Sequence, residues 1–531
     1  MNLIGNINAI PFRRFRGGGG VSPFPSITGM IARYSALGLT NEQMATNPVW
    51  VDKTGNGHDL QMKNFAWKGM SGVGGYGDEN YQTFYKFTLD DYVFMASPPG
   101  VKHMNFTFRV TGLQPGNKLT LTFFGTTNTA YGTWDKDGIY TVDADIVEAG
   151  KPTYFYNGYG ATRGEFTIEI LPLYSGALVF DGVDDYGICD NFPILTKEKG
   201  YTVVALRQWI TYNPNAISAI ATNASDRSFN GAFTFENYNK GAEQTISYGA
   251  TQISLQYSKS PFSWQTTFKY NGFNIANGNK DATNSLVLGR SYPQRNDFAN
   301  FAIWELVFLD HDATEEELTK IKDYFVKTYP WLFLDQAWTV TGKTNEDEDR
   351  ATIANITGNG NNLVLSNFGF AEGSGYNEEG EYAGYLVTDG VDDKIVSSVF
   401  VMGKDFTIVG DWKFIGNKKS NTGLVKGSSF YIYNTMIGLD LYINSGSVKN
   451  SLDGIKSINA ACSDGRAYDR NWNEILANTG NVVGSGGMLE VSSSGARFDR
   501  MAFKNLAIYP TILSKEDCIK AYNYLQTLKA K

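Results

Sequence analysis

The chain contains little cysteine and little histidine. Its three cysteines are an odd number spread over the whole length of 531 residues, which argues against a disulfide framework and favours folding in a reducing cytoplasm. Three histidines offer little material for acid–base or metal chemistry, and no serine lies in a GxSxG motif. The residues in question are Cys189, Cys462, Cys518, His58, His103 and His311. The composition therefore gives little support to catalysis.

Long hydrophobic runs and long basic runs are also missing. No apolar stretch is long enough to cross a bilayer, and the first 20 residues lack the pattern of a secretory signal. With 46 Lys and Arg against 54 Asp and Glu, the net charge is −8, which is unfavourable for nucleic acid or an anionic membrane. Neither membrane insertion nor nucleic-acid binding is expected.

Glycine and aromatic residues are abundant instead. The chain has 57 glycines and 14% aromatic residues, a composition typical of many strands joined by tight turns. This composition predicts an all-β fold. A chain of this length is too long for one core and should form about three or four domains.

An internal repeat runs through the chain in collinear blocks. TGNGHDLQMKNFAW begins at Thr54 and matches TGNGNNLVLSNFGF at Thr357, an offset of 357 minus 54, or 303. A Gly-Tyr pair ending at Tyr76 is matched with one ending at Tyr376, at offset 300. At the shared DGVDD the offset falls to 389 minus 181, or 208, and it stays near 200 to the end. One fold is therefore expected twice.

The drop in offset predicts a domain inserted in the first copy. The difference, 300 minus 208, gives about 92 extra residues, which we place at 77–173. This segment alternates polar and apolar residues in short runs such as NFTFRVTGL and KLTLTFFGT, separated by turns such as DKDG. Six or seven short strands in this length favour an Ig-like β-sandwich.

Each copy is expected to end in one amphipathic helix. Thr314 with Glu317 forms a capping box, and Ser514 with Asp517 is an acidic variant of the same signal. We expect both helices to lie against the edge of a sandwich and to bury a single stripe. The stripes are Leu318, Ile321, Tyr324 and Phe325 in the first helix and Cys518, Ala521, Tyr522 and Leu525 in the second.

The order of TGNGHDL, FDGVDDY and a final strand followed by a T/SxxE helix resembles the LamG-like, concanavalin A-type jelly-roll lectins. The string TNEQMATNPVWVDKTGNGHDLQMKNFAWKGMSGVGGY resembles LamG-like virion proteins of gut Bacteroidales phages, including the crAss-like group. The second copy departs from this pattern because it lacks the tryptophan and the GMSG segment. The repeat and its interruption predict an N-terminal arm (1–26), a first copy (27–76 and 174–333), the insert (77–173) and a second copy (334–531), and the resemblance, which covers neither the arm nor the insert, implies that the two copies are jelly rolls.

Three groups of residues are candidate sites. The acidic turns could each bind one calcium ion through oxygen ligands, or they could be structural turns whose aspartates accept backbone N–H bonds; they comprise Asp181, Asp184, Asp185, Asp389, Asp392 and Asp393. Aromatic residues of the insert could bind carbohydrate or fill its core: Tyr131, Trp134, Tyr154, Tyr156 and Tyr159. An arm before four glycines could anchor the chain to a partner: Phe12, Arg13, Arg14, Phe15 and Arg16.

The resemblance implies a phage virion protein, a head or tail fibre or a decoration protein assembled in the bacterial cytoplasm, and the scarcity of catalytic motifs favours a non-enzymatic role. Its partners would be other virion proteins, through the arm, and glycans on the bacterium or gut surface, with homo-oligomers expected. A bacterial surface adhesin and a glycoside hydrolase are the alternatives. The acidic runs NEDEDR at 345 and DADIVE at 143 do not reproduce the ExDxE strand of the glucanases of this fold, and DADIVE is interpreted as a strand edge.

Overall fold

A computed structural model defines an all-β fold with several sheets and three α-helices among the residues it describes. The chain divides into two compact units, residues 1–79 with 172–329, and residues 80–171 with 330–531. The insert thus groups with the second repeat, although it interrupts the first. The described residues are 23–76, 86–89, 92–95, 103–123, 129–145, 153–158, 164–193, 195, 200–211, 221–223, 233–235, 252–257, 285–290, 298–357, 360–398, 400–415, 422–426, 430–434, 438–443, 451–453, 458–476, 486–487, 489–491, 493–494, 497–498 and 500–530.

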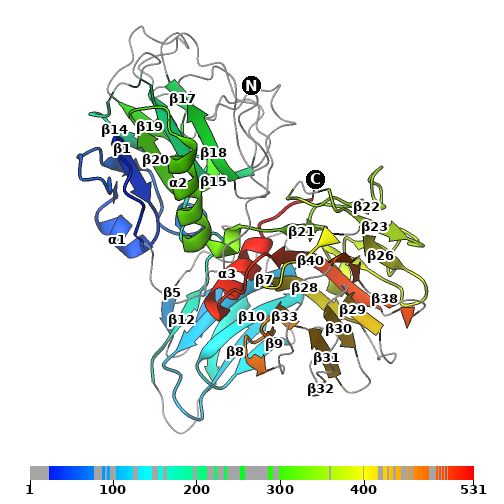
Figure 1. The fold of residues 1–531 in the computed structure, drawn as a ribbon. Helices are drawn as coiled ribbons and strands as arrows, with labels where there is room; N and C mark the ends of the chain where they lie inside the picture. The colour runs from blue at the N-terminus through cyan, green and yellow to red at the C-terminus, as the bar shows by residue number, and fades with distance from the viewer. Residues whose placement is uncertain are drawn as a thin grey trace. The chain divides into compact units, whose positions relative to one another are not determined.

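The first repeat consists of two antiparallel sheets of six strands each that enclose one core (Figure 1). The first sheet has the order β18 (Gln252–Tyr257), β15 (Thr202–Thr211), β20 (Asn300–Leu309), β13 (Leu178–Asp181) and β4 (Gly72–Val73), and β1 (Met30–Ser35) also pairs with β20. The second has the order β17 (Phe233–Phe235), β16 (Ala221–Asn223), β19 (Leu286–Leu288), β14 (Tyr186–Cys189), β3 (Leu60–Lys63) and β2 (Val49–Trp50).

The second repeat has two larger sheets. The first runs β24 (Gly375–Asn377), β25 (Tyr385–Val387), β40 (Met501–Tyr509), β28 (Thr407–Phe414), β33 (Ile458–Cys462), β34 (Arg466–Asp469) and β35 (Glu474–Leu476), with β21 (Gln336–Thr339) on β40. The second runs β22 (Thr352–Ile353), β23 (Leu363–Ser366), β26 (Lys394–Ser397), β37 (Glu490–Val491), β29 (Thr422–Lys426), β30 (Phe430–Asn434), β31 (Gly438–Ile443) and β32 (Ser451–Asp453). Two strand pairs complete it: β27 (Phe400–Val401) with β36 (Gly486–Gly487), and β38 (Ser493–Ser494) with β39 (Arg497–Phe498).

The two repeats share one strand order. In the first sheets, β4-β13-β20-β15-β18 corresponds to β24-β25-β40-β28-β33; in the second, β2-β3-β14-β19-β16-β17 corresponds to β22-β23-β26-β37-β29-β30. The match of Tyr76 with Tyr376 is wrong by three residues. Tyr376 exchanges both of its backbone hydrogen bonds with the Asn345 amide, as Val73 does with Asn41, so the offset is still 303 at this strand. A terminal Gly-Tyr is too short a motif to set a register.

In the described part of the insert, two four-stranded sheets form a sandwich, which gives eight strands there where six or seven were expected. One sheet runs β10 (Gly138–Asp145), β7 (His103–Thr111), β12 (Phe166–Ile170) and β5 (Lys86–Leu89); the other runs β6 (Tyr92–Met95), β11 (Thr153–Gly158), β8 (Lys118–Phe123) and β9 (Thr129–Trp134). Phe108 of β7 contacts Phe155 of β11 with ring centroids 5.1 Å apart, which places the core between the sheets.

The helices begin at the predicted caps. Helix α2 (Glu315–Thr328) follows the Thr314–Glu317 capping box, α3 (Lys515–Leu525) follows Ser514, and a short α1 (Asn41–Thr46) follows Thr40. Neither α2 nor α3 lies at a sandwich edge as expected. Tyr324 of α2 donates to Glu305 on the interior strand β20, and α3 lies against β28 and β40 (Figure 1). The outer face of each first sheet still carries apolar surface, which an edge position would leave in water.

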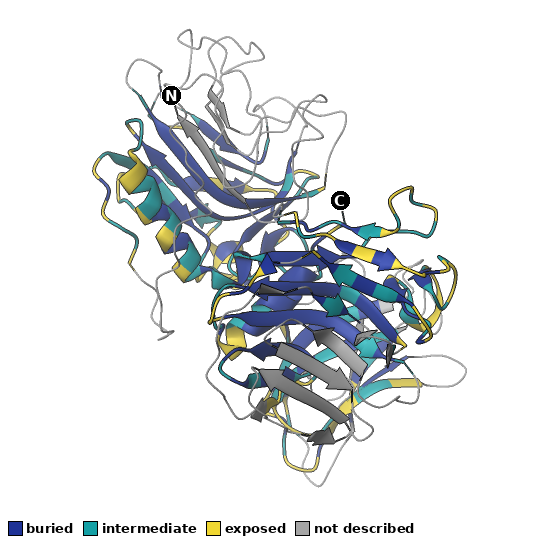
Figure 2. Ribbon diagram, turned by 45° about the vertical axis from the view of Figure 1, so that its right-hand side comes forward, coloured by how far each residue is buried: buried dark blue, intermediate teal, exposed yellow. Residues whose placement is uncertain are grey.

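Burial follows the sandwich pattern in both repeats. Strands β15, β20, β28 and β40 of the first sheets are buried along nearly their whole length, strands β14 and β26 of the second sheets bury every other residue, and α2 buries one stripe (Figure 2). Ile321, Tyr324 and Phe325 are buried on α2, as predicted, and Leu318 is half-buried. On α3 all four predicted residues are buried. The three cysteines are buried free thiols. Among the described residues, no helix is long and apolar enough to cross a membrane.

Loss of the α2 cap should lower stability measurably. The Thr314 hydroxyl accepts the Glu317 N–H, and alanine has no side-chain group that could accept it instead. Thr314→Ala should therefore reduce the free energy of unfolding by about 1 kcal/mol. The control is Thr319→Ala, which removes a hydroxyl bonded to the Glu315 carbonyl inside the helix and should change stability by less than about 0.5 kcal/mol. Urea unfolding measures both, and equal effects would refute the capping role.

Candidate functional site

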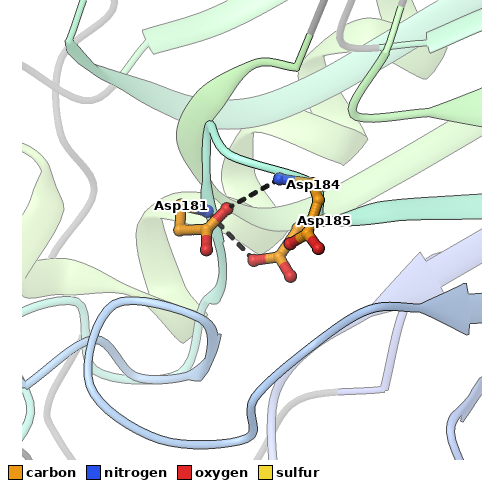
Figure 3. Close-up of side chains that lie close together, drawn as sticks. All are labelled: Asp181, Asp184 and Asp185. Carbon is orange, nitrogen blue, oxygen red and sulfur yellow. Dashed lines mark hydrogen bonds between the residues drawn. The ribbon is translucent and has the colours of Figure 1, made fainter. Parts of the chain in front are cut away.

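The acidic turn of the first repeat is closed by its own carboxylates (Figure 3). It follows β13, and one oxygen of Asp181 accepts the N–H groups of Val183 and Asp184, at 2.8 and 3.5 Å. Asp185 accepts the N–H of Asp181 at 3.0 Å. Gly182 has φ +78°, and a Cβ there would stand 2.7 Å from Asn300, so only glycine fits.

The second repeat reproduces this turn bond for bond. Asp389 accepts the N–H groups of Val391 and Asp392 at 2.7 and 3.3 Å, and Asp393 accepts the N–H of Asp389 at 2.7 Å. Gly390 has φ +75°, and a Cβ there would lie 2.9 Å from the backbone nitrogen of Arg500. These contacts account for the first aspartate, the glycine and the last aspartate of each DGVDD motif by the turn they build, whereas the exposed valine and the exposed fourth-position aspartate take part through backbone groups alone.

Each acidic turn also holds the loop between two other strands. Ser71 donates to Asp185 at 2.9 Å and accepts the Ala66 N–H, while the Asn64 amide donates to the Asp184 carbonyl. In the second repeat, Ser374 and Asn367 make the corresponding bonds to Asp393 and the Asp392 carbonyl. Sequence reasoning missed both pairs, although NF followed by SG is present in each copy.

The loop itself keeps the same backbone in both copies, although the sequence of the second copy lacks the tryptophan and the GMSG segment. Trp67 has φ 53° and its counterpart Phe370 has φ 48°, so both hold the left-handed conformation. An aromatic ring replaces the missing tryptophan, and the serine of GMSG is retained as Ser374. The departure concerns side-chain identity and leaves the turn intact.

Burial makes the inner carboxyl of each turn a weaker acid than an ordinary aspartate. Asp185 is fully buried, and loss of hydration, reinforced by the nearby Asp181, raises the pKa of its carboxyl to about 8. Burial likewise raises the pKa of Asp393 to about 6. Asp184 and Asp392 are exposed. Each inner carboxyl therefore ionises at a cost that its hydrogen bonds offset only in part.

The oxygens of each turn are close enough for one cation. In each triad, one carboxylate oxygen per residue can be chosen so that all lie within 4.8 Å of one another. Calcium takes six to eight oxygen ligands, so three carboxylates would need carbonyl or water ligands in addition. A bound ion would also have to compete with the hydrogen bonds that close the turn.

The aromatic residues of the insert divide between its two faces. Trp134 lies among core rings, 4.8 Å from Phe108 and 5.5 Å from Tyr140. Phe155 points inward and is fully buried, so its neighbours Tyr154 and Tyr156 point to the outer face of that sheet. Tyr156 is 41% exposed. Tyr131 is half-buried at a bulge in β9, and Tyr159 lies outside the described residues.

Tyr156 shares its outer face with hydroxyl groups. It lies directly opposite Thr120 in the ladder of β11 with β8, and the Thr120 and Thr133 hydroxyls are 3.2 Å apart. Lys118 and Thr133 are exposed. The arrangement offers one ring and several hydrogen-bonding groups on a sheet surface. The arm residues Phe12 to Arg16 lie outside the described residues.

Comparisons with known proteins identify no family for this chain. No family model matches it, and no curated protein matches it by sequence. Among solved structures, it is similar to a Trypanosoma rangeli sialidase in complex with sialic acid, at 10% identity over 82% of each chain with a TM-score of 0.27. It is also similar to the binding domain of botulinum neurotoxin serotype D, at 11% identity over 63% of this chain and 84% of that one, with a TM-score of 0.24. Likenesses this weak assign neither a fold family nor an activity.

The raised pKa of Asp185 predicts a specific pH dependence. Between its ordinary pKa of 3.8 and about 8, the folded state keeps a proton that the unfolded state has lost, so raising the pH from 5 to 8 should lower the free energy of unfolding. Asp185→Asn cannot ionise and should reduce this decrease by about 1 kcal/mol or more, measured by urea unfolding at both pH values.

Asp184→Asn is the matched control for that measurement, because it neutralises an exposed carboxylate of the same turn. It should leave the pH dependence close to that of the unmodified chain. If Asp185→Asn and the unmodified chain lost equal stability between pH 5 and 8, burial of the Asp185 carboxyl would not be the cause.

Proposed function

We propose that this chain is a non-enzymatic virion structural protein, a fibre or decoration protein that presents lectin-like sandwiches to glycans. Two repeats with one strand order and one final helix each support tandem jelly rolls of the LamG type as the architecture. The phage assignment rests on the sequence resemblance alone. In this role the arm around Phe12 to Arg16 attaches the chain to other virion proteins.

The observation that carries glycan binding is the outer face around Tyr156. A half-exposed ring beside threonine hydroxyls can stack on the apolar face of a sugar while neighbouring groups bond its hydroxyls. Such a contact is weak, and a millimolar site contributes only about −4 kcal/mol. Copies arrayed on one particle would raise avidity by ~10² to 10⁴, so a weak site is sufficient for adhesion.

The acidic turns serve as scaffold in this proposal. Their hydrogen bonds join the end of one strand to a loop between two others in each repeat, which is a sufficient reason for the duplicated motif. Calcium is a further proposed ligand of these carboxylates, and a binding experiment with and without calcium decides whether it contributes.

A glycoside hydrolase is less well supported. The Asp143 and Asp411 carboxylates both lie within about 3.4 Å of the Tyr385 hydroxyl, which is close enough for a pair of catalytic acids. However, their side chains are 1% and 0% exposed, and both are paired with Arg470. A substrate could reach them only after the insert had separated from the second repeat.

Glycan binding is tested on an array with the full chain and two substitutions. For any glycan that the unmodified chain binds on the array, Tyr156→Ala should weaken the binding about tenfold, because the stacking surface is lost. Tyr156→Phe keeps the ring and should retain most of the binding. Parallel arrays with calcium and with chelator separate a calcium-dependent site from this one. No binding under either condition would leave the sandwiches purely architectural.

The virion assignment has its own test. Antibody labelling or cryo-electron microscopy of intact particles should place the N-terminal 20 residues against a head or tail protein. Finding the chain on a bacterial surface, in a genome neighbourhood of export genes rather than capsid and tail genes, would favour the adhesin instead.

A further inference from the structure

The insert contacts the second repeat through its outward-facing polar side chains. On β10, Tyr140 and Val142 are buried in the insert core, so Thr141 and Asp143 point out of the sandwich. Asn105 and Thr107 on β7 lie opposite Asp143 and Thr141 in the ladder and share this outer face. These four residues form the docking face of the insert, where Asn105 donates to Asp411 of β28 and Thr141 accepts from Trp472 in the loop after β34.

The second repeat meets this face with two cations and a carboxylate. The Arg470 guanidinium contacts Asp143 and also Asp411, the latter at 3.3 Å, and the Lys413 ammonium lies 2.9 Å from Asp143. Asn105 donates to Asp411 at 3.0 Å. Two negative and two positive groups thus balance across the interface, and each buried carboxylate has a cation.

A preformed loop presents Arg470. It lies between β34 and β35, where the Asp469 carboxylate accepts the N–H groups of Asn471 and Asn473 at 2.8 Å each. Trp472 on this loop holds φ 56°, is fully buried, and donates its indole N–H to the Thr141 hydroxyl at 3.1 Å. The loop conformation is held from within the second repeat, so the surface is organised before the insert reaches it.

Among the described residues, the first repeat lacks the counterparts of Asp411, Lys413 and Tyr385, and the counterpart of the Arg470 loop lies outside those residues. In the backbone ladder of β28 with β40, Asp411 lies opposite Asn505 and Lys413 lies opposite Ala502. In the equivalent ladder of β15 with β20, Leu206 lies opposite Glu305 and Gln208 lies opposite Ala302. Tyr385 corresponds to Ala177, one residue before the paired Leu178. The acid, the lysine and the tyrosine of the second repeat are therefore replaced by a leucine, a glutamine and an alanine.

The first repeat uses Glu305, a buried acid on this face, internally. Glu305 pairs with Arg33 at 3.1 Å and accepts the hydroxyls of Tyr324 and Tyr329 at 3.3 and 2.7 Å, which ties α2 and β1 to β20. At the described positions that correspond to Asp411 and Lys413, a buried Asp143 carboxylate would meet Leu206 and Gln208, neither of which carries a charge. The two repeats thus differ in the groups that can receive the insert.

We propose that the outer face of the second repeat, formed by Tyr385, Asp411, Lys413, Arg470 and Trp472, is a docking surface specific for the chain's own insert, with Asp143 as the residue that selects it. The partner is a β-sheet face that presents one buried carboxylate. Pairing of charges decides which of two similar repeats the insert joins, because the described residues of the first repeat place Leu206 and Gln208 where the second repeat has Asp411 and Lys413.

Hydrogen exchange of the full chain tests the proposal. Asp143→Asn should raise exchange at least tenfold in peptides covering 138–145 and 466–473, because the docking face loses its charge partner and opens more often. The interior strands β8 and β11 should exchange unchanged, since the insert stays folded. Glu516→Gln is the matched control: it removes one carboxylate from the exposed 3.4 Å pair with Arg109 at the interface rim and should change exchange by less than twofold.

A double substitution distinguishes docking from general destabilisation. If Asp143 acts through Arg470, the pair Asp143→Asn with Arg470→Gln should open the interface much less than the sum of the two single changes. Additive effects would overturn the proposal, and so would unchanged exchange at 138–145 and 466–473. Faster exchange of β8 and β11 to the same extent would overturn it as well, because Asp143 would then support the insert's own fold.

Discussion

Buried aspartate carboxylates organise this molecule. A carboxylate removed from water needs as many N–H, O–H or cationic partners as it can reach, and those partners must come from segments the fold can bring to it. Asp185 and Asp393 each accept a backbone N–H at the end of a strand and the hydroxyl of a serine in a distant loop. Asp143 of the insert and Asp411 of the second repeat both pair with Arg470, and these pairs link the two sandwiches. In each case the polar contact specifies which segments meet, while apolar burial supplies most of the stabilisation.

Duplication and divergence can be separated along the two repeats. The acidic turns, the loop that follows β3 or β23, and the helix caps are retained in both, since each of them closes a local element whose geometry is fixed by the strand order. Among the described residues, the two repeats differ on the outer face of the first sheet. In the first repeat, Glu305 pairs with Arg33 and holds that repeat's own helix. In the second repeat, Asp411 and Lys413 lie on the surface that contacts the insert.

The insert presents different chemistry on its two outer faces. Asn105, Thr107, Thr141 and Asp143 face the second repeat, whereas Tyr156 with Thr120 and Thr133 lies on the opposite sheet. Both follow from the two-residue period of a strand, which sends alternate side chains into the core and out of it. A module held through one face can present the other in a fixed direction relative to the repeat that holds it. This arrangement suits a protein whose weak contacts have to act together.

The sequence by itself determined the features that local chemistry and periodicity encode. It predicted the β class, the repeat, the insertion near residue 77 and both helix caps, because glycine-rich turns, alternating strands and capping boxes act over a few residues. Periodicity could not show which side of a strand faces a neighbour, so Trp134 was grouped with Tyr156 although its ring lies in the core. Only the tertiary structure decided that Ser71 completes the turn at Asp185 and that Asp143, interpreted as a strand edge, meets Arg470. These pairs lie 114 and 327 residues apart, and no local pattern links groups that come together only when the sheets have formed.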